Sequence, residues 1–372
     1  MKIGIITYWN SSDNYGQQLQ CYALQKFLRD QGHDAFLIKY SPKDVYKSSF
    51  KAHKILEYIR HFGAYAKYAN QLWQNNVYAN SSNYSARKFS EFRDKYICST
   101  LQVFDKKSIR TSPPEADAYI CGSDQIWGSH DSVYYLSFAP KGSIKIAYAP
   151  SFGGQADFDN VYATKLRALL NDFSLITLRE QSGVKTLEQM GVTGAVQVVD
   201  PTLLLSRKDY ESLIDMHIEA KDLFVYLLGN PIVCSTKDIF RYARHNFQSY
   251  RYVASQGRND EAQNSERLTI PQWIDSIRQS RIVITNSFHC VIFALLFHRP
   301  FVFVPLSGSF NRMNDRLYDI LSASGLTSQV YQGDFSSIPT TISFELFDKM
   351  QRQERQKALS LLQKALSTKR LN

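Results

Sequence analysis

Residues 284–290 bring polar and titratable side chains into an otherwise apolar stretch of the chain. They read ITNSFHC and are followed by VIFALLFHRPFVFVP, which predicts a buried strand, a short turn, an apolar helix and a second buried strand. His289 falls where the helix is expected to begin, and the free backbone N–H groups at that end can bind an anion. Histidine, with a usual pKa of about 6.5, transfers protons at neutral pH. We therefore expect His289 to act as a general acid or base, the alternative being a core histidine bonded to backbone.

Polar residues beside this histidine and after the first strand extend the candidate site. Asn286 and Ser287 precede the helix, and as helix-capping residue types they either cap it or bind the anion. Asn14, Tyr15 and Gly16 lie between the strand-like KIGIITYW and a helical segment, where Gly16 permits close approach of a ligand. An ordinary strand-to-helix turn is the alternative. No GxGxxG pattern is present there, so dinucleotide binding is not predicted.

Arginines supply the positive charge that an anion requires. Arg179 ends the strand-like SLITL, and a guanidinium binds a carboxylate or phosphate through two parallel hydrogen bonds. Because ligands bind at the carboxyl ends of strands in open parallel sheets, we expect Arg179 to face the ligand. An ion pair with Glu180 is the alternative. Arg312 and Arg316 follow PLSGSFN and are expected to reach the same cleft from the other side.

The elements that position these residues follow a repeated strand, polar loop and helix pattern. This pattern predicts an open parallel α/β sheet, and it restarts near residue 206. A chain of 372 residues also exceeds the usual size of a single core. We predict two Rossmann-like domains, residues 1–205 and 206–372, facing a cleft, with a last helix at about 344–366 that packs back on the first domain. Asp200-Pro201 is interpreted as the turn that leaves the first domain.

Composition places the chain among ordinary globular proteins, with 44% hydrophobic and 21% charged residues. No apolar run reaches the roughly 18 to 20 residues of a membrane span. The opening MKIGIITYWNSSDNYG reads as a first core strand rather than a signal peptide. Five cysteines are scattered without a CxxC pair, which argues against a zinc site or a disulfide framework. We therefore expect a cytoplasmic protein without a metal.

One basic and aromatic segment interrupts the pattern of strands. Residues 43–110 hold thirteen Lys or Arg and five Asp or Glu, an excess of +8 out of the formal net charge of +10. The segment lies between recognisable strands, so we predict an insertion with its own helices. Such a segment suits an anionic partner, namely a phosphate-bearing lipid, a membrane surface or a nucleic acid. A solvated helical face with aromatic packing beneath it is the alternative.

Six blocks of sequence, in this order, resemble the polysaccharide pyruvyl transferase family: NYGQQLQCYALQ, CGSDQIW, YAPSFG, LREQSG, VVDPTLLL and ITNSFHCVIFALLFHRPFV. The resemblance implies a GT-B-like fold and transfer of an enolpyruvyl-derived group from phosphoenolpyruvate to two hydroxyls of a sugar, which makes a cyclic pyruvate ketal. Ser287-Phe288 departs from the Arg-Leu of some branches, and Cys290 stands where glycine is common. The positive charge must therefore come from Arg179 or from the region of Arg312.

The resemblance assigns roles to the candidate residues. His289 is expected to protonate the methylene carbon of phosphoenolpyruvate, and Asp124 to act as a base on an acceptor hydroxyl. The predicted donor-binding residues are Asn14, Tyr15, Gly16, Arg179, Asn286, Ser287, Arg312 and Arg316. The predicted acceptor-binding residues, in the loop after the strand-like AYIC, are Ser123, Gln125 and Trp127, the last stacking on the sugar ring.

The expected partners are phosphoenolpyruvate, as co-substrate rather than cofactor, and a glycan acceptor. We expect a galactose- or N-acetylhexosamine-type residue of a cell-surface polysaccharide or of its undecaprenyl-pyrophosphate-linked precursor. The basic insertion suits a lipid-linked acceptor at the inner face of an anionic membrane, and no nucleic-acid partner is expected. A GT-B glycosyltransferase using a nucleotide-sugar is the alternative function, and a non-enzymatic membrane-docking protein is the second.

Overall fold

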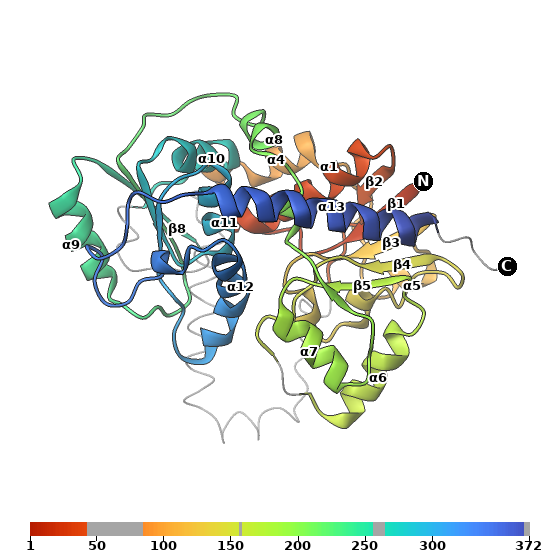
Figure 1. Cartoon of the computed structure of the whole chain (residues 1–372). Coiled ribbons are helices and arrows are strands. Elements are labelled where there is room, and N and C mark those ends of the chain that lie inside the picture. Colours follow the sequence, from red (N-terminus) through yellow and green to blue (C-terminus); the bar gives the residue numbers. More distant parts are fainter. Residues whose placement is uncertain (43–84, 156–157, 256–264, 368–372) are drawn as a thin grey trace, which may run out of the picture.

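The computed structural model describes residues 1–42, 85–155, 158–255 and 265–367. Two α/β domains lie side by side, and helix α13 (Glu345–Ser367) runs across both of them (Figure 1). The first sheet lies within residues 2–197 and the second within residues 223–303, so the predicted boundary after residue 205 falls between them. The predicted α/β fold, with a parallel sheet in each of two domains, is confirmed.

The first sheet is parallel and has the strand order β2-β1-β3-β4-β5-β6. Its strands are β1 (Lys2–Ile6), β2 (Asp34–Leu37), β3 (Ala118–Cys121), β4 (Ile144–Ala147), β5 (Leu175–Leu178) and β6 (Val196–Gln197). Its main helices are α1 (Tyr15–Asp30), α6 (Asn160–Leu170) and α7 (Gln181–Gln189). The direction of strand addition reverses between β1 and β3, which is where open α/β sheets bind ligands. There, Thr7 Oγ1 donates to the carbonyl of Ser123 at 2.8 Å and ties the two strand ends together.

The second sheet is also parallel, with the order β10-β9-β7-β8. Its strands are β7 (Leu223–Leu228), β8 (Tyr250–Ser255), β9 (Ile282–Thr285) and β10 (Phe301–Phe303). Its helices are α9 (Thr236–Asn246), α10 (Ile270–Gln279), α11 (Phe288–Leu296) and α12 (Asp315–Ala323). The strand order reverses between β7 and β9. The side-chain amide of Asn286 links the two strand ends there, since it accepts from the backbone N–H of Leu228 (2.7 Å) and donates to its carbonyl (3.1 Å).

Shorter elements connect the strands and helices. They are α4 (Phe89–Tyr96), α5 (Ser108–Thr111), α8 (Arg207–Glu211), and the 3-10 segments η3 (Ser85–Arg87), η4 (Ile126–Ser129), η5 (Ser132–Tyr135), η6 (Pro201–Leu203), η8 (Gly308–Asn314) and η9 (Thr327–Gln329). Capping boxes at Ser206 and Thr269 start α8 and α10, because each side chain and the residue three positions later satisfy each other's free N–H groups.

The two domains share one apolar core that spans both sheets. Tyr15 of α1 stacks on Trp273 of α10 with ring centroids 5.1 Å apart, and both side chains are fully buried. Helix α13 contacts β4 and β5 of the first domain, and Gln351 donates to the carbonyls of Leu203 and Leu205. Each large apolar side chain buried this way contributes about 1.5–3 kcal/mol, so the domains are held together firmly.

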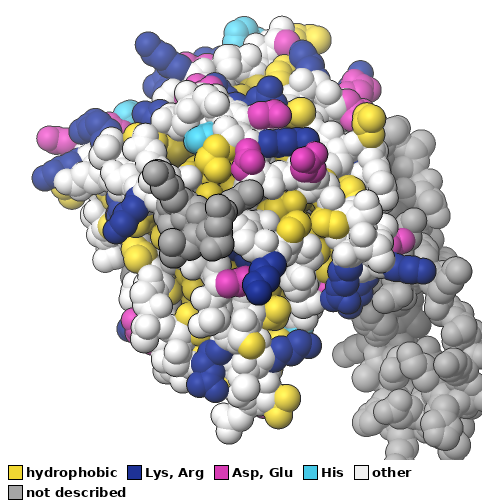
Figure 2. Space-filling view, turned by 90° about the vertical axis from the view of Figure 1, so that its right-hand side faces the viewer, with side chains coloured by type: hydrophobic (Ala, Val, Ile, Leu, Met, Phe, Trp, Pro, Cys, Tyr) yellow, Lys and Arg dark blue, Asp and Glu magenta, His cyan; other side chains and the backbone are white. Residues whose placement is uncertain are grey.

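The structure describes only part of the predicted basic insertion. Residues 43–84 lie outside the described residues, so the anionic partner of this segment stays a prediction. In its described remainder, Lys88, Lys95 and Lys106 pair with acidic side chains at 3.3, 3.7 and 3.9 Å. On the face shown in Figure 2, basic side chains are interspersed with acidic ones. Of the helices described, none is both long and apolar enough to cross a bilayer.

Candidate active site

His289 is the second residue of α11, close to the position predicted from sequence. Ser287 caps this helix, since its Oγ accepts from the backbone N–H of Cys290 (3.4 Å). The side chain of His289 is largely buried, and its Nε2 lies 3.6 Å from Oδ2 of Asp200. A histidine of the second domain therefore faces a carboxylate of the first.

Asp200 is fully buried and connects several of the candidate residues. Its Oδ2 accepts from Arg179 Nη1 (2.9 Å) and Ser123 Oγ (3.1 Å), and its Oδ1 accepts from the backbone N–H and hydroxyl of Thr202 (3.0 and 2.7 Å). Burial alone would raise the pKa of this carboxyl, but His289, Arg179 and the Thr202 amide together hold it well below its usual value. Asp200 is therefore an anion at neutral pH.

The sequence interpretation of Asp200 as a turn residue was incomplete. It does cap the 3-10 segment η6, but the same carboxylate orients both a guanidinium and an imidazole. The pattern V-V-D-P-T carried no signal for the second role, because Asp-Pro is common in turns.

Gly16 packs directly against the ring of His289. A Cβ atom placed on Gly16 would overlap Nδ1, Cγ and Cβ of that histidine. The first turn of α1 in one domain thus meets the first turn of α11 in the other. Gly16 is needed because any side chain would push the imidazole away from Asp200, so its place is against the histidine rather than in an open ligand loop.

Two arginines from different domains flank the ring of Phe288. Arg179, at the end of β5, and Arg316, in the first turn of α12, each place the guanidinium carbon 5.0 Å from the ring centroid. With its amide oxygen turned toward Arg316, Gln125 accepts from Nη1 (2.8 Å) and Nη2 (3.2 Å) of that arginine. The prediction that both arginines reach one site from opposite sides therefore agrees with their positions.

Three carboxylates lie close to these arginines, namely those of Asp124, Glu180 and Asp200. Burial would lower the pKa of Arg179, but the three carboxylates raise it above its usual value. Burial and the nearby charge of Arg179 lower the pKa of Arg316 to about 10, which still leaves it cationic at neutral pH. The two positive charges are thus held together at some electrostatic cost.

Several donors in this buried cluster have no acceptor among the described residues. They are Nε and Nη2 of Arg179 and Nε of Arg316, while Nε2 of His289 also makes no hydrogen bond. The nearest carboxylate oxygens of Asp124 and Glu180 are 4.0 and 3.9 Å from Arg179, too far for a hydrogen bond. An unsatisfied buried donor costs about 1–3 kcal/mol. Oε2 of Glu180, in the same cluster, also lacks a hydrogen-bond partner.

Asp124 borders the same cluster and is only partly buried. Its backbone lies in the left-handed region (φ 72°), and its Oδ1 accepts from the N–H of Gln125 (2.8 Å). A carboxylate at this edge, next to a buried guanidinium, is well placed to accept a proton from an incoming hydroxyl. Its predicted role as a base therefore stays a prediction with suitable geometry.

The predicted sugar contacts of Trp127 and Ser123 need correction. Trp127 is fully buried, donates from Nε1 to the carbonyl of Tyr134 (3.1 Å) and stacks on Tyr135, so its ring is unavailable to a sugar. Ser123 is fully buried too, and its hydroxyl lies within hydrogen-bond distance of two acceptors, the carboxylate of Asp200 and the carbonyl of Ala149. Ser123 therefore positions Asp200 instead of contacting an acceptor.

Four predicted donor-binding residues use their polar atoms within the fold. Asn14 caps α1 by accepting from the N–H of Gln17 (3.1 Å). The hydroxyl of Tyr15 donates to the carbonyl of Leu268 (2.7 Å). The side-chain amide of Asn286 bonds to the backbone of Leu228 and links the ends of β7 and β9. Ser287 caps α11. These side chains build the site, which corrects their assignment as donor ligands.

Arg312 is more exposed than Arg179 and Arg316. It is exposed on η8, and its backbone packs beside Gly154, close to where Arg316 begins the next helix. Between the two arginines proposed from sequence, Arg316 joins the cluster and Arg312 borders it. Burial, which the sequence did not reveal, separates their roles.

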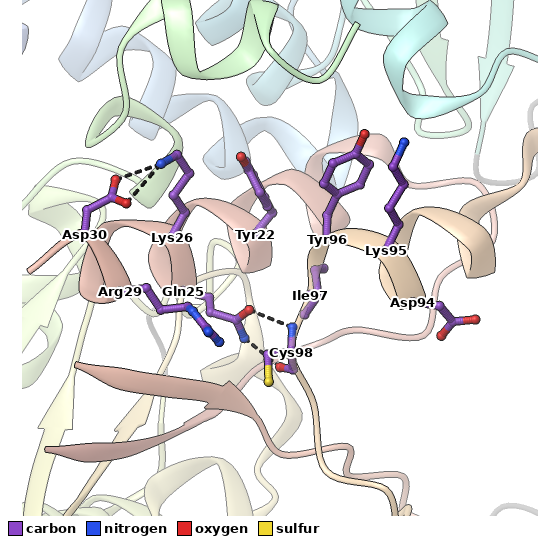
Figure 3. Close-up of a pocket in the computed structure, with 10 residues that line it drawn as sticks. All are labelled: Tyr22, Gln25, Lys26, Arg29, Asp30, Asp94, Lys95, Tyr96, Ile97 and Cys98. Atoms are coloured by element: carbon purple, nitrogen blue, oxygen red, sulfur yellow. Dashed lines mark hydrogen bonds and ion pairs between the residues drawn. The ribbon is translucent and has the colours of Figure 1, made fainter. Parts of the chain in front are cut away.

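A second group of charged residues lines a surface pocket of about 440 Å³ between α1 and α4, called here the α1–α4 pocket. Its lining residues are Tyr22, Gln25, Lys26, Arg29, Asp30, Asp94, Lys95, Tyr96, Ile97 and Cys98 (Figure 3). Lys26 pairs with Asp30 (2.9 Å), and Lys95 with Asp215 (3.7 Å). The pocket follows the later turns of α1, whereas His289 meets the first turn, so the two are separate.

The fold and the cluster define a two-domain α/β protein with a group of charged side chains, several of them buried, at the contact between its domains. In the described part of the chain, no group of three or more His, Cys, Asp or Glu residues is arranged to hold a metal ion. The chain belongs to the polysaccharide pyruvyl transferase family, whose sequence profile matches residues 14–308. It is therefore a transferase of a family that acts on polysaccharides, which implies a glycan acceptor.

Solved structures offer only distant likenesses. A UDP-GlcNAc 2-epimerase from Neisseria meningitidis bound to UDP-GlcNAc is 9% identical, with 98% of this chain and 94% of that chain covered and a TM-score of 0.44. The glycosyltransferase SnogD from Streptomyces nogalater is 13% identical, with coverage of 99% and 95% and a TM-score of 0.39. None of the curated protein sequences compared with this chain matches it. The inference of function therefore rests on the family and on the site.

Proposed function

We propose that this protein transfers a pyruvyl group from phosphoenolpyruvate to two hydroxyls of a sugar, forming a cyclic ketal and releasing phosphate. The observation that carries this proposal is the buried set of unsatisfied donors on Arg179 and Arg316 beside His289. Phosphoenolpyruvate carries both a carboxylate and a phosphate, so it can use two guanidinium groups held a short distance apart. Family membership supports pyruvyl transfer as the reaction class.

The proposed reaction begins with proton transfer from His289 to the methylene carbon of the donor. The carbon–carbon double bond becomes a methyl group beside an oxocarbenium centre, and one sugar hydroxyl adds to that centre. The bond to the phosphate oxygen then breaks, and a second hydroxyl adds and closes the ring. One hydroxyl proton replaces the proton given to carbon, and the other leaves with phosphate. Asp124 accepts a hydroxyl proton at the edge of the site.

Asp200 serves as a positioning residue in this scheme. It touches Arg179 and faces His289, so it holds the imidazole where a proton can be delivered. Its role is therefore to place the imidazole, and it does not bind the donor itself.

The proposal is tested with the purified full chain, phosphoenolpyruvate and a panel of acceptors: methyl glycosides of galactose, N-acetylglucosamine and N-acetylmannosamine, and a lipid-pyrophosphate-linked disaccharide. We expect phosphate release together with a product heavier by one pyruvyl group. A parallel assay supplies UDP-sugars with the same acceptors. Release of UDP with no consumption of phosphoenolpyruvate would contradict the proposal and favour a glycosyltransferase.

A further inference from the structure

A stack of aromatic rings at the surface comes from the loops that follow β3 and β4 and from the first turn of α6. The rings of His130 and Tyr162 are nearly parallel, with centroids 4.4 Å apart and an interplanar angle of 26°. Phe158 stacks on Tyr162 at 5.1 Å and 20°, and lies 5.8 Å from His130. His130 is exposed, while Phe158 and Tyr162 are partly exposed. These three residues are called the aromatic platform below.

The fold holds the platform rigidly from beneath. Phe158 packs on the buried Phe152 (5.3 Å), and the hydroxyl of Tyr162 is 3.0 Å from that of the buried Tyr135. Asp159 caps α6 by accepting from the N–H of Tyr162 (2.7 Å), which fixes the start of the helix that carries this ring. Two rings are thus anchored in the core and still present surface to solvent.

His130 is the member of the platform that packing of the core does not explain. Its backbone is in the left-handed region (φ 56°), which is unfavourable for most side chains, and its ring is exposed. Its Nε2 lies 3.1 Å from Oε1 of Gln155, which is also exposed. An aromatic face and two hydrogen-bonding groups therefore occur together at the surface.

The platform continues directly from the arginine cluster. Gly153 packs against the side chain of Gln125, which pairs with Arg316. The next residue, Gly154, packs beside Arg312, and Gln155 follows and reaches His130. Three consecutive residues thus lead from a donor-site contact to the platform. Both lie at the carboxyl ends of strands in the first sheet, where ligands bind in this architecture.

A pyranose ring is the ligand that this combination suits. One face of such a ring presents C–H groups that pack on an aromatic surface, while its hydroxyls around the edge need hydrogen bonds. Aromatic rings with polar edges supply large contact areas at low cost in conformational entropy. The platform contains no Lys, Arg, Asp or Glu, so nothing in it calls for a strongly charged ligand.

We propose that His130, Phe158 and Tyr162 form the platform on which a sugar ring of the acceptor stacks, with Gln155 binding one of its hydroxyls. The platform replaces Trp127, the ring assigned to this task from sequence, whose side chain is fully buried. That the bound sugar is the acceptor rests on the proposed function. Sugar binding itself does not, and the two are tested separately.

The first test measures sugar binding without phosphoenolpyruvate. Methyl glycosides of galactose, N-acetylglucosamine and N-acetylmannosamine are added to the full chain, and saturation-transfer NMR reports which sugar protons touch it. We expect at least one glycoside to bind through its C–H face, with affinity falling about 3- to 10-fold in Tyr162→Leu and in His130→Asn. Asn tolerates the left-handed backbone, so His130→Asn keeps the fold while removing the ring.

Tyr242→Leu is the matched control, because Tyr242 stacks on Phe335 (5.0 Å, 23°) in the other domain. This variant should bind the glycosides as the wild type does. If no glycoside binds the wild type at tens of millimolar, or if the two platform variants bind as well as the control, the inference is overturned.

The second test separates the platform from the proposed reaction. Where pyruvyl transfer is detected, the platform variants should raise KM for the acceptor about 3- to 10-fold and leave KM for phosphoenolpyruvate unchanged. An equal rise in both constants would count against a platform specific to the acceptor. If sugars bind through the platform but phosphoenolpyruvate is never consumed, the platform stands as a glycan site and the proposed function fails.

Discussion

The arginine cluster at the domain contact and the α1–α4 pocket both collect positive and negative side chains, but they use them differently. In the pocket, Lys26 is partly exposed and paired with Asp30 (Figure 3). Lys95 is largely exposed and paired with Asp215. In the cluster, Arg179 is buried and keeps donors without acceptors, close to a second arginine. Exposed pairs contribute about 0–1 kcal/mol, whereas buried charges act through a low local dielectric. We therefore place the proposed chemistry by burial and unused hydrogen-bonding capacity, because both regions are rich in charges.

The largest contrast is expected between two histidines at opposite ends of α11. Replacing the buried residue, His289→Asn, should lower turnover about 10²- to 10⁴-fold with little change in folding, because a general acid is lost. The control is His298→Asn, since His298 is exposed and pairs with Asp348 (2.9 Å) on the surface. Steady-state assays of phosphate release measure both. Equal activity of the two variants would remove His289 from the mechanism.

The next contrast compares a buried carboxylate with one in the pocket. Asp200→Asn should cost about 3–5 kcal/mol in the free energy of unfolding, because Arg179 loses its buried partner, while Asp30→Asn should cost at most about 1 kcal/mol. Urea unfolding measures both.

The pH dependence of these unfolding curves has a definite sign. The pKa of Asp200 is lower in the folded chain than in the unfolded chain, where it is about 3.9. Its contribution is therefore present above that value and is lost as the pH falls below it. The difference between wild type and Asp200→Asn should shrink with acidification. A difference that is constant with pH would contradict the assignment of Asp200 as a buried anion.

A smaller effect is expected from a methyl group at the domain contact. Gly16→Ala should displace the imidazole of His289, because the added methyl group would overlap its ring. We expect turnover to fall about 10- to 100-fold, since a catalytic group displaced by about 1 Å can lose that much of its rate enhancement. Gly183→Ala is a matched control in the first turn of α7, where an added Cβ meets its neighbours at ordinary contact distances of 3.4–3.5 Å. If Gly16→Ala retains full turnover, the close packing of α1 on His289 is not needed for catalysis.

The smallest effect is expected in the α1–α4 pocket itself. Lys26→Met removes a partly exposed ammonium that is paired with Asp30 and Asp209. Screening by solvent keeps such pairs weak, so phosphoenolpyruvate affinity and turnover should stay within about twofold of wild type. A large loss of donor affinity in this variant would mean that the pocket, rather than the buried cluster, binds the anion.

Much of this organisation follows from local sequence pattern. The strand-loop-helix repeats predicted both parallel sheets, and the ends of strands and helices predicted the positions of His289, Arg179 and Arg316. These predictions succeed because the carboxyl ends of parallel strands meet at one edge. The family resemblance added the reaction class, which pattern alone does not supply.

The remaining features depend on contacts between distant segments. Tryptophan often contacts sugars, but Trp127 is fully buried. Aspartate before proline is common in turns, but Asp200 of the first domain also faces His289 of the second. Burial of this kind is set by tertiary packing, which residue type and spacing do not encode. The same holds for Tyr15 and Asn286, whose polar atoms are consumed by backbone groups of other strands and loops.

The most direct test of the central claim is calorimetric titration of phosphoenolpyruvate into the full chain, without acceptor. The account predicts that Arg316→Met weakens binding at least about tenfold, because the donor loses one of its two guanidinium partners. The control Arg312→Met, on the exposed neighbour, should bind nearly as the wild type does. Equal affinity in wild type and Arg316→Met would contradict it.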